Sequence, residues 1–470
     1  MNDQEYISHL KSHIRSQDSL LAKQAEQLRI QASKIEQLEK KVEQLLFMLQ
    51  KQGVKKNSQN SHHAPSKDLF VAKNKSLREP STRKTGGQPG HKGHTLEMSS
   101  DASITFDLKN DYCTRCGNKL EDVVFTLKSK RQVMDIPSIP PPVYTEYRQY
   151  SCTCANCDHK QVADFPAGVN APIQYGCHIE ALVSYFSVFQ YMPYGRMKSM
   201  FSRLFGLALS EGSIQNILQK AATKAQGCYE WIKSELSKSS MVGSDETSVH
   251  VNGKKDWIWV WQNTSNTWML ASENRGSSTV DSVWEIGLLD SILVSDRLAA
   301  QLKTPSGGNQ ICLAHLLRDL TYLKEAEKHP FAKQFISFLR EIFDFKKKMI
   351  ERNASSNEQE AALFENRLNK LLDISIAKQE YPKTLTFQNS MLKCQKFILP
   401  CLHHLEVPPD NNASERAIRN IKVKQKVSGQ FKSGQHAFCV LRSVIDTCIK
   451  RNLDVFYTLI QIMSRNFSFQ

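Results

Sequence analysis

The sequence predicts a mixed α/β protein whose central element is a mixed β-sheet followed by helices. Three segments of alternating or apolar residues, 241–251, 254–262 and 267–272, predict three successive strands. Helical spacing over 278–287 and an apolar strand over 290–297 follow them. Three strands, a helix and a further strand are the order of an RNase H-like sheet, in which the first and fourth strands lie side by side.

Length and composition fit a chain of about three domains. The chain has 470 residues, and domains usually hold roughly 100–200 residues each. A hydrophobic content of 40% excludes a wholly disordered chain. No apolar run approaches the roughly 18 residues of a membrane span, and the N-terminal MNDQEYISHLK lacks an apolar signal core. We therefore expect a cytoplasmic, nucleoid-associated protein whose 12 Cys are thiols or metal ligands.

The net charge of +15 is concentrated in two segments. Residues 51–94 hold ten Lys and Arg against two acids, and residues 416–451 hold nine against one. A basic excess confined in this way predicts a polyanionic partner, most simply nucleic acid. A solvated basic surface is the alternative for either segment.

Residues 1–50 predict a coiled-coil helix. Apolar residues recur every seventh position, and neither Gly nor Pro interrupts them. The seam comprises Ile7, Ile14, Leu21, Leu28, Ile35, Val42 and Leu49, with Leu10, Gln17, Gln24, Gln31, Leu38 and Leu45 at the offset-three positions. The three Gln weaken the seam but can fix its register. We expect a homodimer or a larger assembly, and a helix packed on its own chain is the alternative.

Residues 51–100 predict a basic linker, because Pro, Ser and Asn interrupt any periodicity. Within it, GGQPGHKGH at 86–94 exposes backbone N–H groups and cationic side chains, which suits phosphate contact. Lys84 and Lys92 are the candidate DNA-binding residues of this segment. A flexible tether has the same composition.

Residues 101–165 predict a structural zinc module similar to a zinc ribbon. Two Cys-x2-Cys pairs, Cys113 with Cys116 and Cys154 with Cys157, supply the four thiolates of a closed tetrahedral site. The 37 residues between the pairs exceed the roughly 15–20 of the compact pattern. They contain strand-like runs, so we expect a hairpin there. Cys152 is an alternative ligand, and four unrelated buried Cys are the alternative to a metal site.

Residues 166–235 predict a helical DNA-binding region. Apolar spacing is helical over most of it. Gly206 separates two candidate helices, and Ser210 or Glu211 can cap the second. This pattern is typical of a helix-turn-helix, although an ordinary helical hairpin in a core has the same pattern.

Three carboxylates are the candidate catalytic and metal-binding residues. Asp245 lies on the first predicted strand, Asp296 ends the fourth, and Glu415 lies in the first turn of a helix that follows two Pro. Carboxylates about 4 Å apart repel by about 4 kcal/mol per pair at an effective dielectric constant near 20, so such a cluster needs cations. Oxygen ligands suit Mg²⁺ or Mn²⁺, and two such ions can promote phosphodiester chemistry.

Other interpretations of these acids remain open. Glu415 can form an ordinary ion pair with Arg419, four residues further along the helix, and the two aspartates can simply cap strand ends. Glu246, Asp290 and Asp410 are alternative candidates for the cluster.

Several motifs along the chain are typical of one protein family. They are KNSQNSHHAPSKD, GGQPGHKGH, RQVMDIPSIPPPVYTEYRQYSC, PIQYG, QYMPYGRM, SDET, CLAHLLRDL and DNNASERAIRN. By these motifs the chain resembles the insertion sequence 66 (IS66) family of transposases, which belong to the Asp-Asp-Glu class. The resemblance implies catalytic acids at Asp245, Asp296 and Glu415 and a zinc-containing DNA-binding region before the core. It also implies an accessory Cys-x2-His element, here Cys312 and His315, and small accessory proteins.

The chain departs from the family pattern at two places. Leu313 stands where the family usually has an aromatic residue, and Arg318 is the only basic residue in the run CLAHLLRDL. VKQKVSG replaces an RKN-like stretch after Glu415. These differences concern the DNA contacts that flank the acids rather than the chemistry.

The 119 positions from Asp296 to Glu415 exceed what an RNase H-like core needs. Residues 316–405 have helical periodicity and predict an all-helical insertion between the two parts of the core, 236–315 and 406–470. Cys312 and His315 are then expected either to start a helix or to contact DNA near the metals, with plain core packing as the alternative.

The resemblance implies a transposase that binds the terminal inverted repeats of its element, cuts them and joins the 3′-OH to target DNA. Two Mg²⁺ (or Mn²⁺) ions per site would serve both steps. The residues expected to hold phosphates are Arg416, Arg419, Lys422, Lys424 and Lys426. If about eight phosphates are neutralised, log K should fall with log salt at a slope of roughly −7. A catalytically inactive DNA-binding repressor and a nuclease that does not join DNA are the alternatives.

Overall fold

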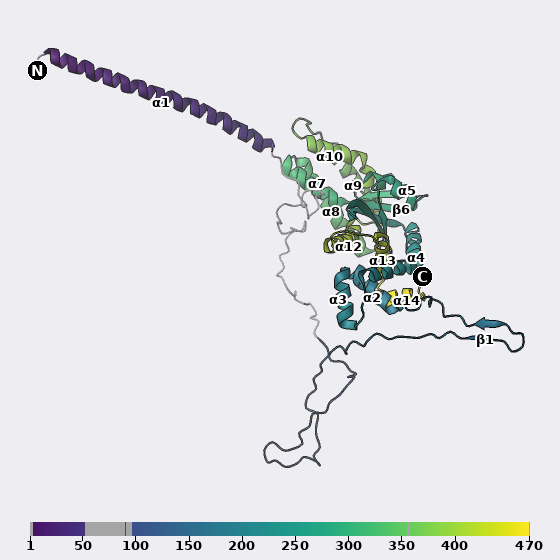
Figure 1. Cartoon of the computed structure of the whole chain (residues 1–470). Coiled ribbons are helices and arrows are strands. Elements are labelled where there is room, and N and C mark those ends of the chain that lie inside the picture. The colour runs from purple at the N-terminus through teal and green to yellow at the C-terminus, as the bar shows by residue number, and fades with distance from the viewer. Residues whose placement is uncertain (1–2, 52–89, 91–95, 355–357, 470) are drawn as a thin grey trace. The chain divides into compact units, whose positions relative to one another are not determined.

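The computed structural model describes residues 3–51, 90, 96–354 and 358–469 of the chain (Figure 1). The chain divides into two compact units, each considered separately below. The sheet unit contains Ile232–Ser248 and Asp256–Asn420 together with the N-terminal helix, and the helical unit contains Lys75–Trp231, Val249–Lys255 and Ile421–Gln470. Among the described residues, no helix is long and apolar enough to cross a membrane.

The sheet unit is built on a five-stranded sheet with the order β5-β4-β3-β6-β7. The strands are β3 (Met241–Val251), β4 (Lys254–Gln262), β5 (Thr267–Ser272), β6 (Leu288–Ser295) and β7 (Ser306–Ile311). β4 and β5 are antiparallel, whereas β6 runs parallel to both β3 and β7. Helix α5 (Ser277–Val283) stands between β5 and β6 in the chain. The mixed sheet fits an RNase H-like core, and the predicted adjacency of the first and fourth strands is confirmed.

Both faces of this sheet are covered. On β4, residues 258–262 are all buried, and the rings of Trp259 and Trp261 stack with their centroids 5.6 Å apart. Met241 of β3 and Ile292 of β6 belong to a second apolar cluster that also contains Phe335 from the helices after the sheet. Such two-sided burial explains why the middle of β4 is a continuous apolar run rather than an alternating one.

The described residues between β7 and α12 form helices joined by turns and contain no strand, as expected of a helical insertion. Its elements are α7 (Leu313–Ala326), α8 (Pro330–Arg352), α9 (Glu358–Leu372), α10 (Pro382–Lys393), a 3₁₀ turn (Gln395–Phe397) and α11 (Pro400–His403). Apolar residues of α7 and α8 pack against each other and against β3 and β6. The helical insertion is therefore fused to the core of the sheet unit.

The helical unit contains the segments flanking the sheet in sequence. They are α2 (Cys177–Ser184), a π-helical turn (Tyr185–Phe189), α3 (Tyr194–Phe205), most of α4 (Glu211–Ser237), the end of α12 (Asn412–Ser428), α13 (Gln435–Lys450) and α14 (Val455–Met463). Gly206 ends α3 in the left-handed conformation, with φ of 62°. The hydroxyl of Ser210 accepts a hydrogen bond from the backbone N–H of Ser213 and so caps α4, as predicted. Both predicted helices are confirmed.

Helix α1 (Asp3–Lys51) is a single helix of 49 residues. The apolar seam residues from Ile7 to Val42 are each between 44% and 65% exposed, and the side chains of Leu45 and Leu49 lie outside the described ones. The helix is confirmed, while its pairing with a second copy stays a prediction.

Residues 96–169 carry little regular structure. A short antiparallel hairpin of β1 (Ser151–Thr153) and β2 (Lys160–Val162) encloses the second Cys pair. The hairpin predicted between the two pairs is wrong, because residues 121–150 contain no strand in this described segment. Proline at 137 and at 140–142 removes donors that a strand ladder would need.

Candidate active site

Strand pairing places two of the predicted acids side by side. β3 and β6 run parallel, and the last recorded partners are Gly243 and Val294. Asp245 and Asp296 each lie two residues further along their segments, so they emerge at the same edge of the sheet. Parallel strands present their carboxyl ends together, which is why residues 51 positions apart meet here.

Asn411 brings the third acid to the same place. Its side-chain amide donates to the Ser244 carbonyl at 2.7 Å, and its backbone N–H donates to Cys312 Sγ at 3.2 Å. Its own carbonyl accepts the N–H of Glu415 at 3.1 Å, which opens α12. A further bond, from the Leu313 N–H to the Pro409 carbonyl (2.9 Å), joins the two ends of the helical insertion. The sequence predicts the helix start at Glu415, but it contains no sign of this tie to β3.

Gly243 makes the close approach of α12 to β3 possible. A Cβ at this position would lie 2.5 Å from Gln262 Nε2 and 2.8 Å from Ser414 Oγ. Gln262 of β4 also donates to the Ser414 hydroxyl at 3.3 Å, so β4 and α12 are hydrogen bonded beside Gly243. The role of Gly243 was not predicted, because nothing local to a strand glycine shows which element packs against it.

The acids lie close enough to change one another's ionisation. Burial, followed by the charges of Asp296, Glu246 and Glu415, raises the pKa of Asp245 well above its ordinary value. The backbone N–H of Glu246 donates to Asp245 Oδ1 at 2.8 Å and partly opposes this rise. The three predicted acids therefore form one electrostatic cluster.

His315 and Arg318 of α7 lie between two of these acids. His315 Nδ1 is 2.9 Å from Asp296 Oδ1, although not in hydrogen-bond geometry, and its Nε2 is 3.7 Å from Glu415 Oε1. Arg318 Nη1 lies 2.8 Å from His315 Nε2, and its Nη2 lies 3.5 Å from Glu415 Oε1. Arg is only a donor, so His315 Nε2 accepts and the ring proton is on Nδ1. Among the described residues, the ion pair recorded for Glu415 is thus with Arg318 of α7 and not with Arg419.

The donor set fits a divalent cation. Within the described parts of the chain, Asp296 Oδ1 and Glu415 Oε1 are buried oxygens that accept no hydrogen bond. Asp296, Cys312 and His315 also each offer a ligand atom within 4.8 Å of the others. Burial raises the pKa of the Cys312 thiol, so it stays protonated, and a thiol in this form is not a metal ligand. Buried carboxylate oxygens without donors are ligands that a hard cation would satisfy.

The alternative acids have structural roles or lie in solvent. Glu246 accepts two hydrogen bonds from Arg275 at 2.9 and 2.7 Å and one from Gln301 at 3.2 Å. Asp410 accepts from the backbone and side chain of Asn412 and so caps α12. Asp290 of β6 is exposed.

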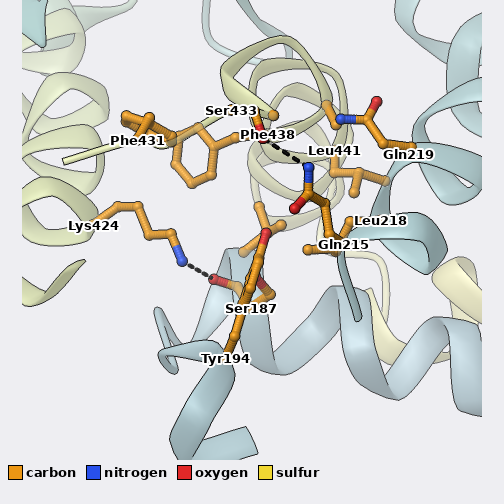
Figure 2. A pocket seen from close by; sticks show the side chains of 13 residues that line it. Ser187, Tyr194, Gln215, Leu218, Gln219, Lys424, Phe431, Ser433, Phe438 and Leu441 are labelled. Carbon is orange, nitrogen blue, oxygen red and sulfur yellow. Dashed lines mark hydrogen bonds between the residues drawn. The ribbon is translucent and has the colours of Figure 1, made fainter. Parts of the chain in front are cut away.

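The predicted phosphate-binding residues of α12 fall into two groups. Arg416, Arg419, Lys422 and Lys426 are exposed. Lys424 is buried, and its ammonium donates to the Ser187 carbonyl at 3.3 Å and lies 5.8 Å from the centre of the Tyr194 ring (Figure 2). Lys424 is thus not exposed, whereas the prediction of a phosphate contact requires exposure. It follows the fully buried Ile421 by three positions, so both residues lie on the same buried side of the helix. Lys84 and Lys92 lie outside the described residues.

Each predicted zinc pair forms a tight turn, but the structure does not bring the two pairs together. The Gly117 N–H donates to the Cys113 carbonyl and the Asp158 N–H to the Cys154 carbonyl, both at 2.9 Å. Backbone hydrogen bonds lower the pKa of the Cys113 and Cys154 thiols. Among the described residues, the trio of Asp296, Cys312 and His315 is the one cluster of His, Cys or acidic ligands at metal-binding distance. Cys152 is exposed.

Two family models match the chain. The Transposase IS66 family matches residues 173–438, and a family of unknown function (DUF6444) matches residues 10–97. No curated protein matches it. The first match spans more than half of the chain and includes all three acids.

Proposed function

Because the chain belongs to the IS66 family of transposases, we propose that it cuts and joins DNA at the cluster of Asp245, Asp296 and Glu415. The observation that carries this proposal is the convergence of three half-buried carboxylates from β3, from the end of β6 and from the first turn of α12. A protein gains no stability from such repulsion, so its retention supports a functional use of the acids.

The carboxylates would hold divalent cations. Mg²⁺ and Mn²⁺ prefer oxygen ligands, and the buried oxygens of Asp296 and Glu415 accept no hydrogen bond from any described residue. When bound, two such ions supply the activation of an attacking oxygen and the stabilisation of the leaving one.

The residues around the acids would keep them in place during both steps. Asn411 and Gly243 fix Glu415 against β3, and His315 lies between Asp296 and Glu415. In the first step water would displace a phosphodiester oxygen at the element end and leave a 3′-OH. In the second, that 3′-OH would attack a target phosphodiester and release a target 3′-OH. One new bond forms for each bond broken, and no covalent protein–DNA link is needed.

Exposed cations in each of the two units would bind the DNA backbone. Arg416 and Arg419 are exposed and directly follow Glu415 along α12. In the helical unit, Lys422 and Lys426 are likewise exposed. Exposed guanidinium and ammonium groups suit phosphate contact, which positions DNA without reading its sequence.

The experiment that tests the site compares Asp245→Asn with Asp290→Asn, an exposed acid on β6, on DNA that flanks the coding region. Asp245→Asn should lose Mg²⁺-dependent strand cleavage while still binding this DNA, and Asp290→Asn should retain both. Equal cleavage by the two variants would show that the wrong acids were chosen. Supplying pre-cleaved ends then separates joining from cleavage, because a nuclease leaves a 3′-OH end unjoined.

We also propose that Cys113, Cys116, Cys154 and Cys157 bind one structural Zn²⁺ between the two turns. The lowered thiol pKa values favour thiolates, the form that binds zinc. Metal analysis of the full chain should find one Zn²⁺ fewer in Cys154→Ser than in Cys394→Ser, a partly buried Cys elsewhere. The same zinc content in both would exclude this site.

The exposed apolar seam of α1 would pair two or more copies of the chain. Replacing Ile14 and Leu21 by Asn should lower the mass measured by light scattering to that of a monomer. An unchanged mass would show that other surfaces hold the assembly.

A further inference from the structure

Helix α3 presents three cations to solvent. Arg196, Lys198 and Arg203 are exposed, and within the described part of the chain none of them forms a recorded ion pair or hydrogen bond. The helix, YGRMKSMFSRLF, contains no acidic residue. Unneutralised charge of one sign on one short helix indicates an anionic partner.

The same helix has a well-defined buried side. Met197 and Phe201 are fully buried. At 3.6 residues per turn, Arg196, Ser199 and Arg203 form a stripe on the opposite side. All three stripe residues are exposed. The helix is therefore anchored by one side and presents a polar, cationic stripe on the other.

Rings and backbone geometry hold α3 in this orientation. Phe201 contacts Phe186 and Phe205, with ring centroids 6.5 and 5.4 Å apart. Pro193 precedes the first turn, and Gly206 ends the last one. Twelve residues at about 1.5 Å each give a rod of roughly 18 Å, which is longer than the roughly 12 Å width of the DNA major groove.

The neighbouring helix α4 lacks such a face within the helical unit. Lys224 is paired with Glu180 at 2.5 Å and donates to the Met463 carbonyl at 2.9 Å, so its charge is used internally. Lys220 is exposed, but acidic Glu211 and Glu230 lie on the same helix. In a helix-turn-helix the second helix usually reads DNA. Here the charge distribution favours the first helix, α3.

We propose that α3 is the recognition helix of this transposase and that it lies in the major groove of the element ends. Arg196 and Arg203 would read guanine O6 and N7, the preferred partners of Arg at base edges. Ser199 would contact the base between them, and Lys198 would contact a flanking phosphate. This assignment rests on the proposed binding of element ends and adds which residues set the sequence read there.

The test is selection of duplexes from a random-sequence pool by the full-length chain, followed by sequencing. The unaltered chain should select a motif containing guanine. Arg196→Ala and Arg203→Ala should each lose the preference at one position and bind the selected duplex about 5- to 150-fold more weakly. Arg203→Lys should weaken the same preference while keeping its affinity for random duplex, since the flexible ammonium lacks the rigid planar fork of the guanidinium.

Lys220→Ala is the matched control, because Lys220 is an exposed cation on α4 in the same unit. It should select the original motif, and so should Asp245→Asn. Unaltered unfolding midpoints would show that the exposed substitutions leave the fold intact.

Selection of the original motif by both Arg→Ala variants would overturn the assignment to α3 while leaving the proposed function in place. A motif changed by Lys220→Ala alone would overturn it in favour of α4. Failure of the unaltered chain to select any motif would instead contradict the proposed binding of element ends.

Discussion

The sheet unit and the helical unit both bury charged side chains, but they do so in opposite ways. In the sheet unit, burial and three neighbouring carboxylates all raise the pKa of Asp245. In the helical unit, burial alone lowers the pKa of Lys424 to about 8. No acidic residue lines the Lys424 pocket, where the ammonium donates to the Ser187 carbonyl beside the Tyr194 ring (Figure 2).

The difference between the two sites separates function from packing. Lys424 is a single charge, and its hydrogen bond and ring contact both come from residues of the helical unit. The ammonium therefore needs no ligand from outside the chain. The acid cluster gathers like charges from three elements, and tertiary hydrogen bonds from Asn411 hold one of them there. A carbonyl can satisfy a lone buried cation, whereas crowded carboxylates need cations from outside. A cluster of like charges, rather than the burial of a single charge, is therefore the feature that indicates a metal-binding or catalytic site.

The largest expected effect is the loss of strand cleavage when one acid of the cluster is replaced by a neutral residue. Asp245→Asn should lower strand cleavage by on the order of 10³-fold or more. Without metal ions the same variant should be more stable by about 1–4 kcal/mol, because a costly buried charge is removed. Cleavage assays and urea unfolding in chelator measure the two effects. A variant that loses both cleavage and stability would contradict the view that the acid cluster costs stability and serves cleavage.

Lys424 should affect stability and not DNA binding. Its pKa is near 8 in the folded chain and about 10.4 when unfolded. Below pH 8 both states are charged, and burial costs roughly 3 kcal/mol. Between these pKa values only the unfolded state keeps the proton, so the free energy of unfolding rises with pH.

Urea unfolding of Lys424→Met and of the unaltered chain at pH 7 and pH 10 measures this effect. The free energy of unfolding of the variant should exceed that of the unaltered chain by roughly 3 kcal/mol at pH 7. This difference should be smaller at pH 10. A difference in stability that stays constant with pH would show that Lys424 has the same pKa in the folded and unfolded chain.

Gly243→Ala should weaken the contact that carries Glu415. Its Cβ would lie 2.5 Å from Gln262 Nε2, so we expect a loss of about 1–3 kcal/mol in the free energy of unfolding together with reduced cleavage. Gly227→Ala is the control, because nothing lies within 4 Å of a Cβ at that exposed position in α4. It should gain about 0.5–1 kcal/mol. Equal effects of the two substitutions would show that α12 does not depend on close approach to β3.

The smallest expected effect is on the salt dependence of DNA binding. Arg416→Ala and Arg419→Ala should each make the slope of log K against log salt, roughly −7 overall, shallower by about 1. Lys424→Met should leave the slope unchanged, since its ammonium is buried. Binding measured across a range of salt concentrations gives the slopes, and an effect of Lys424→Met would mean that its pocket opens to phosphate.

Local patterns predicted the elements that carry the acids, and tertiary contacts account for what was missed. Apolar runs and strand order placed Asp245 and Asp296 at one sheet edge, because parallel pairing follows from the order of strands and helices. Lys424 was placed with the exposed cations, although its helical phase relative to Ile421 indicates burial. Gly243 matters only through a segment about 170 positions away, which no local pattern contains.

The hydrogen bond between the Leu313 N–H and the Pro409 carbonyl closes the helical insertion at its base. The two ends of the insertion thus lie side by side, so the chain returns to the place where it left the sheet. Because α7 and α8 share an apolar core with β3 and β6, the insertion also supports the sheet. Its removal would expose that core and take His315 away from Asp296.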